Sequence, residues 1–481
     1  MGVNEFRKKD LYAFIFILAV GVFFTATLRD GHNPGGDFAQ YILHAKNLAA
    51  GIPYADTGYM YNPNFPGLGP KAYPPVLPWM LVPIVKGFGL NLKPMKILLL
   101  VFYVLSLTLF YFLIRRHLPL PEVLIALGTV GLNPFFWNFK DDVVSDIPFL
   151  CFVFMVFRLA DLAPQPDTRG DKRRTIGFAL AGGVACYLAY GTRTIGIALP
   201  AALVLRDWVR ARRIGLFTAV SCALFAILAV VQHLLLPGGN SYFDQFRSLT
   251  LHGVARNVML YADSMIKFWD NGLAGFAAFR YGLFLGLAGL AAVGFLRRLQ
   301  KPGVEELFSA PYLPIVLLWP TPQGARFMIP ILFLFVFWAF LGLNRIRHTV
   351  MRRAVRMALI FAIGFTYAGK YRTLDFGPIP TGIGDPGQAA CFRYIRSQTP
   401  KNAVFICYEP RILALVAERK ASCYHEAPSD SLLWSYFEQI RATHLVLGPD
   451  DSSTIREFVR RHPSRFERLY DWDRFAIFQI L

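Results

Sequence analysis

The chain has 481 residues, of which 55% are hydrophobic, 15% aromatic and only 17% charged. This composition excludes an ordinary soluble protein and indicates one that is embedded in lipid. A formal net charge of +19 would suggest nucleic acid in a soluble protein, but here the basic residues form short clusters between apolar segments. Such clusters orient membrane helices, so we expect no nucleic-acid partner.

The first helix is expected at 11–28, an apolar stretch that follows the basic residues 7–9 and has no small-residue cleavage site after it. We interpret it as a retained signal anchor. A membrane span needs roughly 20 apolar residues, and fewer where protein covers its ends. On this basis the sequence predicts about eleven transmembrane helices, at 11–28, 97–114, 122–138, 143–160, 175–191, 195–209, 213–236, 276–296, 304–320, 327–344 and 354–369.

The apolar segment 74–90 carries Pro75, Pro78 and Pro83 and decides the topology. If it does not cross the membrane, every basic cluster lies on one side, as the distribution of Lys and Arg in membrane proteins requires. We therefore expect a re-entrant or interfacial helix here, a cytoplasmic N-terminus and a multi-pass protein of the bacterial inner membrane. The expected outer loops are 29–96, 139–142, 192–194, 237–275, 321–326 and 370–481.

The tail beyond residue 369 has balanced charge and is expected to form a small soluble extracytoplasmic α/β domain (370–481), next to a transmembrane domain (1–369). Segments 403–407 and 444–448 predict short buried strands, and 451–463 predicts an amphipathic helix. The tail has no phosphate loop, metal cluster or nucleophile motif, so we expect it to cover or recognise something above the membrane. Its three cysteines allow one disulfide in an oxidising compartment.

The first outer loop contains GlyGlyAspPheAlaGlnTyr (35–41) and LysAlaTyrProPro (71–75). An acidic residue directly after the first membrane helix, a Tyr four positions later, a short amphipathic helix and a Tyr-Pro-Pro entry resemble the GT-C glycosyltransferases. These enzymes depend on polyprenyl-phosphate sugars and include protein O-mannosyltransferases and the aminoarabinose transferases of lipid A. The segments 141–149, 191–196 and 322–330 also resemble this family, so the resemblance covers nearly the whole chain.

The resemblance implies that Asp37 is the general base on the acceptor hydroxyl and that Asp146 is a second catalytic carboxylate. Helix capping is the alternative for both: Asp is favoured at the N-cap, and Asp146 stands just before Pro148 at an expected first turn. One carboxylate suffices as base, because a sugar phosphate already has a good leaving group. A single displacement would invert the anomeric centre.

A polyprenyl phosphate presents its phosphate at the membrane surface, so the site needs cations at that depth. Arg193 and Arg326 are expected there, although an Arg at a helix end can also extend to lipid headgroups. Tyr41, Lys71 and Tyr73 are further candidates for substrate binding, and Tyr and Lys at an interface are often only membrane anchors. We expect the nearby His44 and Lys46 to be solvated on a surface helix.

No His, Cys or Asp grouping has metal-ligand spacing, so we predict no obligatory metal and no cofactor beyond the lipid-linked sugar donor. The predicted function is transfer of a sugar from a polyprenyl-phosphate carrier to a lipid, glycan or protein acceptor at the outer membrane face. A transporter or lipid flippase is one alternative, and a glycan polymerase or ligase with the same fold is another. No internal repeat of the kind found in transporters is evident.

Overall fold

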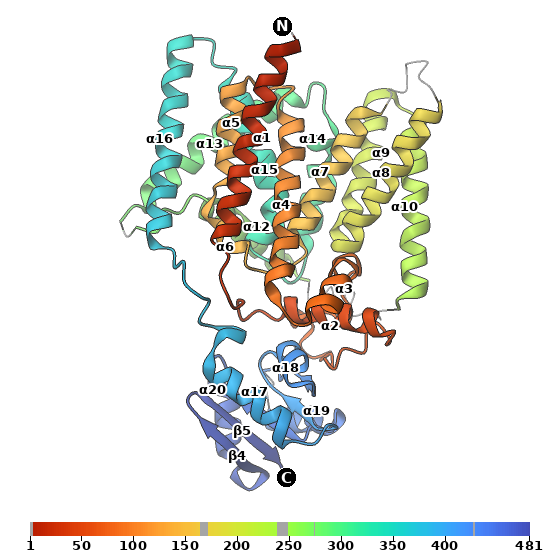
Figure 1. Cartoon of the computed structure of the whole chain (residues 1–481), viewed down its shortest axis with the longest axis vertical. Coiled ribbons are helices and arrows are strands. Elements are labelled where there is room, and N and C mark those ends of the chain that lie inside the picture. The colour runs from red at the N-terminus through yellow and green to blue at the C-terminus, as the bar shows by residue number, and fades with distance from the viewer. Residues whose placement is uncertain (1–2, 164–171, 238–248, 274, 427–428) are drawn as a thin grey trace.

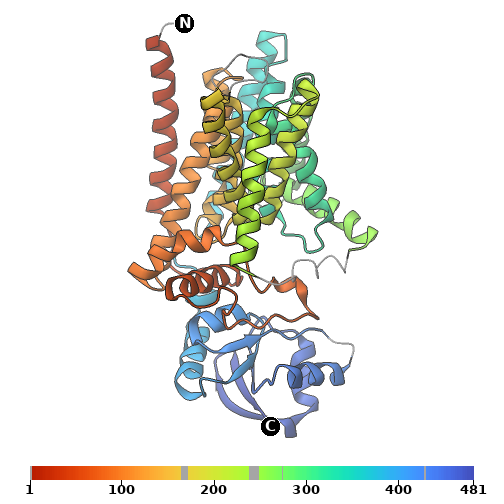
Figure 2. The same ribbon diagram turned by 90° about the vertical axis from the view of Figure 1, so that its right-hand side faces the viewer.

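A computed structural model describes residues 3–163, 172–237, 249–273, 275–426 and 429–481. It has a tall helical bundle with the N-terminus at one end and a small mixed domain with the C-terminus at the other (Figures 1 and 2). Helices α2 and α3 lie between these two parts. Part of the predicted loop 237–275 lies outside the described residues.

The bundle consists of long helices that run along the vertical direction of Figure 1 and shorter ones at their ends. Their bounds are α1 (Val3–Ala26), α2 (Asp37–Ala50), α3 (Val76–Phe88), α4 (Leu92–Ile114), α5 (Leu120–Gly131), α6 (Pro134–Phe139), α7 (Asp146–Leu162), α8 (Lys172–Thr192), α9 (Ala198–Ala211), α10 (Leu216–Leu235), α12 (Leu251–Lys267), α13 (Ala277–Arg298), α14 (Val304–Leu318), α15 (Ala325–Leu343) and α16 (Thr349–Thr373). Short 3-10 turns occur at η1 (Pro66–Leu68) and η2 (Thr194–Ile197).

Five helices of the described chain are long and apolar enough to cross a membrane, namely α4, α8, α10, α13 and α15. Shorter apolar helices occupy Asp10–Ala26, Val76–Phe88 and Leu120–Gly131. Helix α3 has 13 residues, about 20 Å of helix, which is too short for a bilayer core of about 30 Å. That 74–90 stays at one membrane face remains a prediction.

The expected single span 122–138 is wrong, because the helix breaks between α5 and α6. Asn133 is the N-cap of α6, and its side chain accepts a hydrogen bond from the main-chain N–H of Phe135 at 2.9 Å. Pro134 follows at the first helical position, and a proline disfavours helical geometry in the residue before it. The sequence Asn-Pro therefore ends one helix and begins another.

The C-terminal domain contains a five-stranded sheet with strand order β2-β1-β3-β5-β4. Strands β1 (Val404–Ile406), β2 (Lys420–Ser422) and β3 (His444–Leu447) are parallel, whereas β4 (Phe466–Trp472) and β5 (Phe475–Ile480) form an antiparallel pair. The two predicted strands are confirmed, and so is the predicted helix, which is α20 (Ser453–Arg461). The other helices here are α17 (Pro386–Gln398), α18 (Pro410–Ala417) and α19 (Asp430–Gln439), with turns η3 (Gly382–Gly384) and η4 (Pro463–Arg465).

The first outer loop is joined to this sheet through the edge strand β2. The main-chain N–H of Met60 donates to the carbonyl of Ala421 at 2.8 Å, and the N–H of Ala421 donates to the carbonyl of Gly58 at 3.0 Å. The side chain of Asn62 adds a bond to the carbonyl of Cys423 at 2.9 Å. The loop thus covers the open edge of the sheet and ties the helical bundle to the C-terminal domain.

A buried ion cluster holds the ends of three bundle helices together beside this loop. The carboxylate of Asp141 pairs with Arg29 and Lys140 at 2.8 Å each and with Lys96 at 3.7 Å. Arg29 follows α1, Lys96 is the fifth residue of α4, and Lys140 follows α6. Because Asp141 is fully buried, its single carboxylate balances cations that would otherwise repel one another in a medium of low polarity.

We expect Asp141→Ala to lower the stability of the protein strongly, by about 3–5 kcal/mol, because it leaves buried cations without their counter-charge. Loss of helical circular dichroism on heating in detergent micelles measures the effect. The control is Asp471→Ala, which removes an exposed pair with Arg468 and should change stability by less than about 1 kcal/mol. Equal melting curves for the two variants would contradict a structural role of the cluster.

Candidate active site

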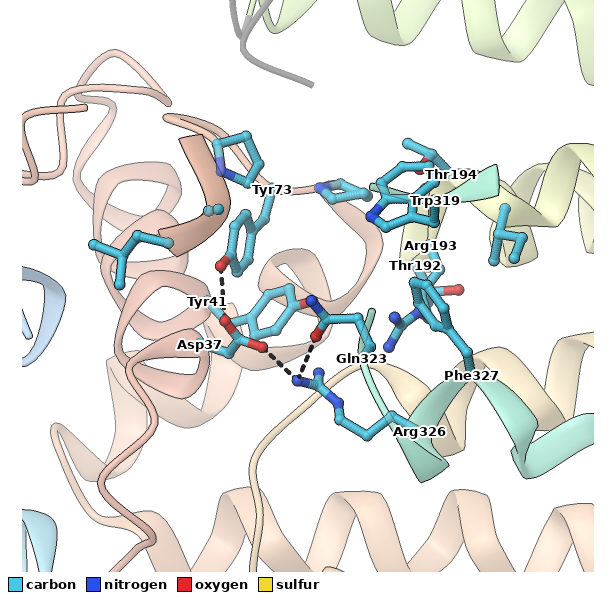
Figure 3. Close-up of a pocket in the computed structure, with 16 residues that line it drawn as sticks. Asp37, Tyr41, Tyr73, Thr192, Arg193, Thr194, Trp319, Gln323, Arg326 and Phe327 are labelled. Carbon is cyan, nitrogen blue, oxygen red and sulfur yellow. Dashed lines mark hydrogen bonds and ion pairs between the residues drawn. The ribbon is translucent and has the colours of Figure 1, made fainter. Parts of the chain in front are cut away.

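A polar cavity lies where the lower end of the bundle meets α2 and the first outer loop. Four segments that are distant in sequence form its walls: the start of α2, the loop 67–74, the break between α8 and α9, and the residues around the start of α15. Figure 3 shows Asp37, Tyr73, Arg193 and Arg326 facing one another across it. The cavity holds only about 90 Å³, well below the usual size of a ligand site.

Asp37 is the first residue of α2, and Gly36 is the N-cap residue, with no side-chain capping bond. The carboxylate is instead held from two sides. Its Oδ2 accepts a hydrogen bond from Nη1 of Arg326 at 2.6 Å, and its Oδ1 accepts from the Tyr73 hydroxyl at 2.8 Å and from Nη1 of Arg411 at 2.9 Å (Figure 3 shows the first two). The helix-capping alternative therefore does not describe this residue.

Asp146 is the first residue of α7 and is buried behind the cavity rather than in its wall. Its Oδ2 accepts from Nη2 and Nε of Arg326 at 2.9 and 3.1 Å, and its Oδ1 pairs with Arg193. The N-cap of α7 is Ser145, whose hydroxyl is 2.8 Å from that of Tyr41. Asp146 thus orients the two arginines from behind.

These contacts belong to one row of alternating charges that runs from the helical bundle into the C-terminal domain. Each carboxylate lies between two guanidinium groups or closes the row. In order, the members are Arg193, Asp146, Arg326, Asp37, Arg411 and Glu409. Because each charge lies beside an opposite one, alternation offsets part of the cost of shielding the row from water.

Burial alone would raise the pKa of the Asp37 carboxyl, but the guanidinium groups of Arg326 and Arg411 outweigh it and hold the pKa well below its usual range. The carboxylate is therefore ionised at any physiological pH. It is also a weak proton acceptor while both arginines remain, since a low pKa means low basicity. Removal of one guanidinium would make Asp37 a better base.

Arg411 and Glu409 were not anticipated from the sequence. They follow β1 and lie at the start of α18, so they stand at the carboxyl end of a parallel strand, where α/β sheets bind their ligands. The sequence did contain one signal for them: the charged segment Glu-Pro-Arg (409–411) closely follows the predicted buried strand 403–407. Bidentate bonds at 2.9 and 3.1 Å join the Arg411 Nη2 to the Glu409 carboxylate, and Arg411 Nη1 also donates to the Tyr73 hydroxyl at 2.7 Å.

Two glycines of the first outer loop make room for this pair. A Cβ atom at Gly36 would collide with the Glu409 carboxylate and would lie 2.6 Å from Nε of Arg411. A Cβ atom at Gly69 would lie 2.6 Å from the Tyr73 hydroxyl, and Gly69 also has a φ of +142°. Both positions therefore need a residue without a side chain so that the C-terminal domain can reach Asp37.

The residues singled out from the sequence divide into three groups. Asp37, Tyr41, Tyr73, Arg193 and Arg326 line the cavity, and Asp146 lies behind it. Lys71 does not line it: its side chain is exposed, and its main-chain carbonyl accepts a bond from Nε2 of Gln40 at 2.8 Å.

The expectation that His44 is solvated is wrong, because α2 lies between the bundle and the C-terminal domain and not on the surface. His44 is buried, and its ring stacks on Tyr54 with centroids 4.1 Å apart. Its Nε2 accepts from the main-chain N–H of Tyr73 at 3.1 Å, which fixes the Tyr73 backbone beside Asp37. Lys46 is half-buried and lies 3.8 Å from Glu418 of the C-terminal domain.

Among the described residues, no three His, Cys, Asp or Glu side chains are grouped so that they could hold a metal ion. The cysteines of the C-terminal domain, Cys391, Cys407 and Cys423, are buried free thiols in this structure. The disulfide allowed by the sequence is therefore not formed.

No protein-family model matches the sequence, and no curated protein matches it. Several solved structures, however, match the fold of the protein. ArnT from Cupriavidus metallidurans bound to undecaprenyl phosphate matches over 97% of both chains, with 14% identity and a TM-score of 0.58. Its apo form matches over 98% of both chains, with 14% identity and a TM-score of 0.59. The oligosaccharyltransferase of Archaeoglobus fulgidus, tethered to an acceptor peptide, matches over 91% of this chain and 69% of its own, with 12% identity and a TM-score of 0.61.

Both proteins are glycosyltransferases of the GT-C superfamily. The match extends over almost the whole chain and includes the bundle, the intervening helices and the C-terminal domain. The protein therefore has the GT-C fold that the resemblance of its sequence predicted.

Proposed function

We propose that the protein transfers a sugar from a polyprenyl-phosphate carrier to a hydroxyl group of a lipid, glycan or protein at the outer face of a membrane. The observation that carries this proposal is Arg326, which bridges Asp37 and Asp146 at the start of the candidate membrane span α15, beside Arg193. The fold supports it, because one matching structure holds undecaprenyl phosphate and another holds a dolichol-phosphate.

In this proposal Arg193 and Arg326 bind the donor phosphate. Both lie at breaks or ends of bundle helices, between α8 and η2 and in the first turn of α15, and guanidinium groups bind phosphate oxygens with paired hydrogen bonds. Asp146 holds both side chains in place from behind. Because the cavity is small while Arg326 contacts Asp37, donor binding must separate that pair and open the site.

The two oxygens of Asp37 then differ in role. Oδ1 stays bound to Tyr73 and Arg411, whereas Oδ2 has Arg326 as its hydrogen-bond partner among the described residues and loses it to the phosphate. The acceptor hydroxyl gives its proton to Oδ2 while its oxygen bonds to the anomeric carbon. The bond from that carbon to the phosphate oxygen breaks, and polyprenyl phosphate leaves with the negative charge. This single displacement inverts the anomeric centre.

The same proposal places the protein as a multi-pass protein of the bacterial inner membrane, with a cytoplasmic N-terminus and the C-terminal domain (370–481) outside. The N-terminus and that domain lie at opposite ends of the molecule (Figure 1), which supports this orientation. The reaction as proposed uses no cofactor besides the lipid-linked sugar. A transporter or flippase is disfavoured, because its binding site should lie near the membrane midplane rather than at one end of the bundle.

A glycan ligase with a larger lipid-linked donor is the second candidate. It is favoured by the match to an oligosaccharyltransferase, which has a TM-score of 0.61. Such an enzyme would use the same charged row and differ in the size of the donor.

Asp37→Asn should lower kcat about 10²–10⁴-fold, because the amide keeps the shape of the carboxylate but cannot accept the proton. Purified protein would be given radiolabelled polyprenyl-phosphate sugars and membrane acceptors, and the labelled product would be isolated. Donor affinity should be retained, since the phosphate contacts come from Arg193 and Arg326. Equal turnover by the variant would remove Asp37 from the mechanism, and no transfer by the wild type from any donor would overturn the proposed function.

Arg411→Gln should move the acid limb of the pH profile of kcat/KM to higher pH. Arg411 lowers the pKa of Asp37, so its removal raises that pKa, and the base is protonated over a wider range of acid pH. Arg411→Lys keeps the charge and should shift the limb less. Arg396→Gln removes an exposed residue of the same domain, paired with Glu418, and should leave the profile unchanged. An unshifted profile for Arg411→Gln would contradict its electrostatic role.

A further inference from the structure

A second cavity lies at the other end of the bundle, far from the charged row. It has a volume of about 560 Å³ and lies where α4 and α15 end and α5 and α16 begin. This is the end of the molecule that carries the N-terminus (Figures 1 and 2). Its volume falls within the usual range of small-molecule and cofactor sites.

The lining of this cavity is strongly basic. Four arginines face a single carboxylate, and the set is Arg345, Arg352, Arg353, Arg356 and Glu122. Arg356 pairs with Glu122 at 3.2 Å. Within the ranges that the structure describes, the other three arginines have no ion-pair partner. His117 adds no charge near neutral pH, because burial and the neighbouring Arg298 lower its pKa to about 4.

The backbone increases this excess of positive charge. Helix α16 starts at Thr349, and the N–H of Met351 donates to Nδ1 of the N-cap residue His348 at 3.3 Å. The first turn has no acidic residue, so no carboxylate balances the partial positive charge of the helix start. Arg352 and Arg353 follow directly. Like charges at such short spacing repel one another, and an anion in the cavity would remove that repulsion.

The depth of the cavity identifies the kind of anion. Helices α4 and α15 are both candidate membrane spans, and the cavity residues Asn344 and Arg345 follow α15 immediately. The ends of membrane spans lie at the level of the lipid headgroups. Basic pockets between such helix ends bind the phosphates of anionic lipids.

We propose that this cavity binds the phosphate of an anionic phospholipid headgroup, and that Arg345, Arg352 and Arg353 are its principal ligands. The site is separate from the proposed transferase site, which lies at the opposite end of the bundle. A lipid phosphate bound in the cavity would link the first turns of α16 to the ends of α4 and α15.

The test is native mass spectrometry of the full-length protein in detergent micelles, titrated with cardiolipin, phosphatidylglycerol or phosphatidylcholine. The wild type should bind the two anionic lipids and discriminate against phosphatidylcholine. The double variant Arg352→Gln/Arg353→Gln should bind them about thirtyfold more weakly, from the usual contribution of an arginine near anionic lipid. Arg352→Lys/Arg353→Lys keeps both charges and should retain most of the affinity.

Arg347→Gln is the matched control, because Arg347 is an exposed arginine of the same connection that does not line the cavity. It should bind lipid as the wild type does. Equal binding of phosphatidylcholine, unchanged binding by the double Gln variant, or an equal loss in Arg347→Gln would overturn the proposal. Displacement of the lipid by millimolar inorganic phosphate would assign the cavity to a free anion instead. If the wild type binds anionic lipid but transfers no sugar from any donor, the lipid site is supported and only the transferase proposal is contradicted.

Discussion

The contact on which the site depends is the guanidinium group of Arg326, shared by Asp37 and Asp146. The two carboxylates come from helices that lie far apart in sequence and would repel each other without a cation between them. The arginine therefore fixes the start of α15 relative to the starts of α2 and α7. It also explains why the cavity is small, because Arg326 stands between the two carboxylates and fills part of the space between them.

The C-terminal domain is part of the same site and does more than cover it. It contributes Arg411, and the first outer loop accommodates that side chain through Gly36 and Gly69. Asp37 is thus held by one arginine from the bundle and one from the C-terminal domain. The geometry around Asp37 therefore depends on the correct assembly of these two parts of the protein.

The sequence was sufficient for the features that depend on local pattern. Hydrophobic length predicted most bundle helices, and apolar runs predicted β1 and β3. The resemblance of three separate segments to one family placed Asp37, Arg193 and Arg326 in a common site. It failed where the answer depended on packing between distant segments. His44 is a polar residue on an amphipathic helix but is buried, because α2 lies between the bundle and the C-terminal domain. Arg411 reaches Asp37 only after the sheet has been placed beside the first outer loop, which no local pattern indicates.

Because residues 58–60 pair with β2, the C-terminal domain would lose part of its sheet edge if it were isolated from the rest of the protein. The bonds that make this joint are between main-chain groups, so they do not depend on which side chains the loop carries, and the joint can persist while the sequence drifts. If the domain were excised, however, β2 would become a bare strand edge with unpaired N–H and C=O groups. The fragment would then acquire an adhesive surface that the intact protein never exposes.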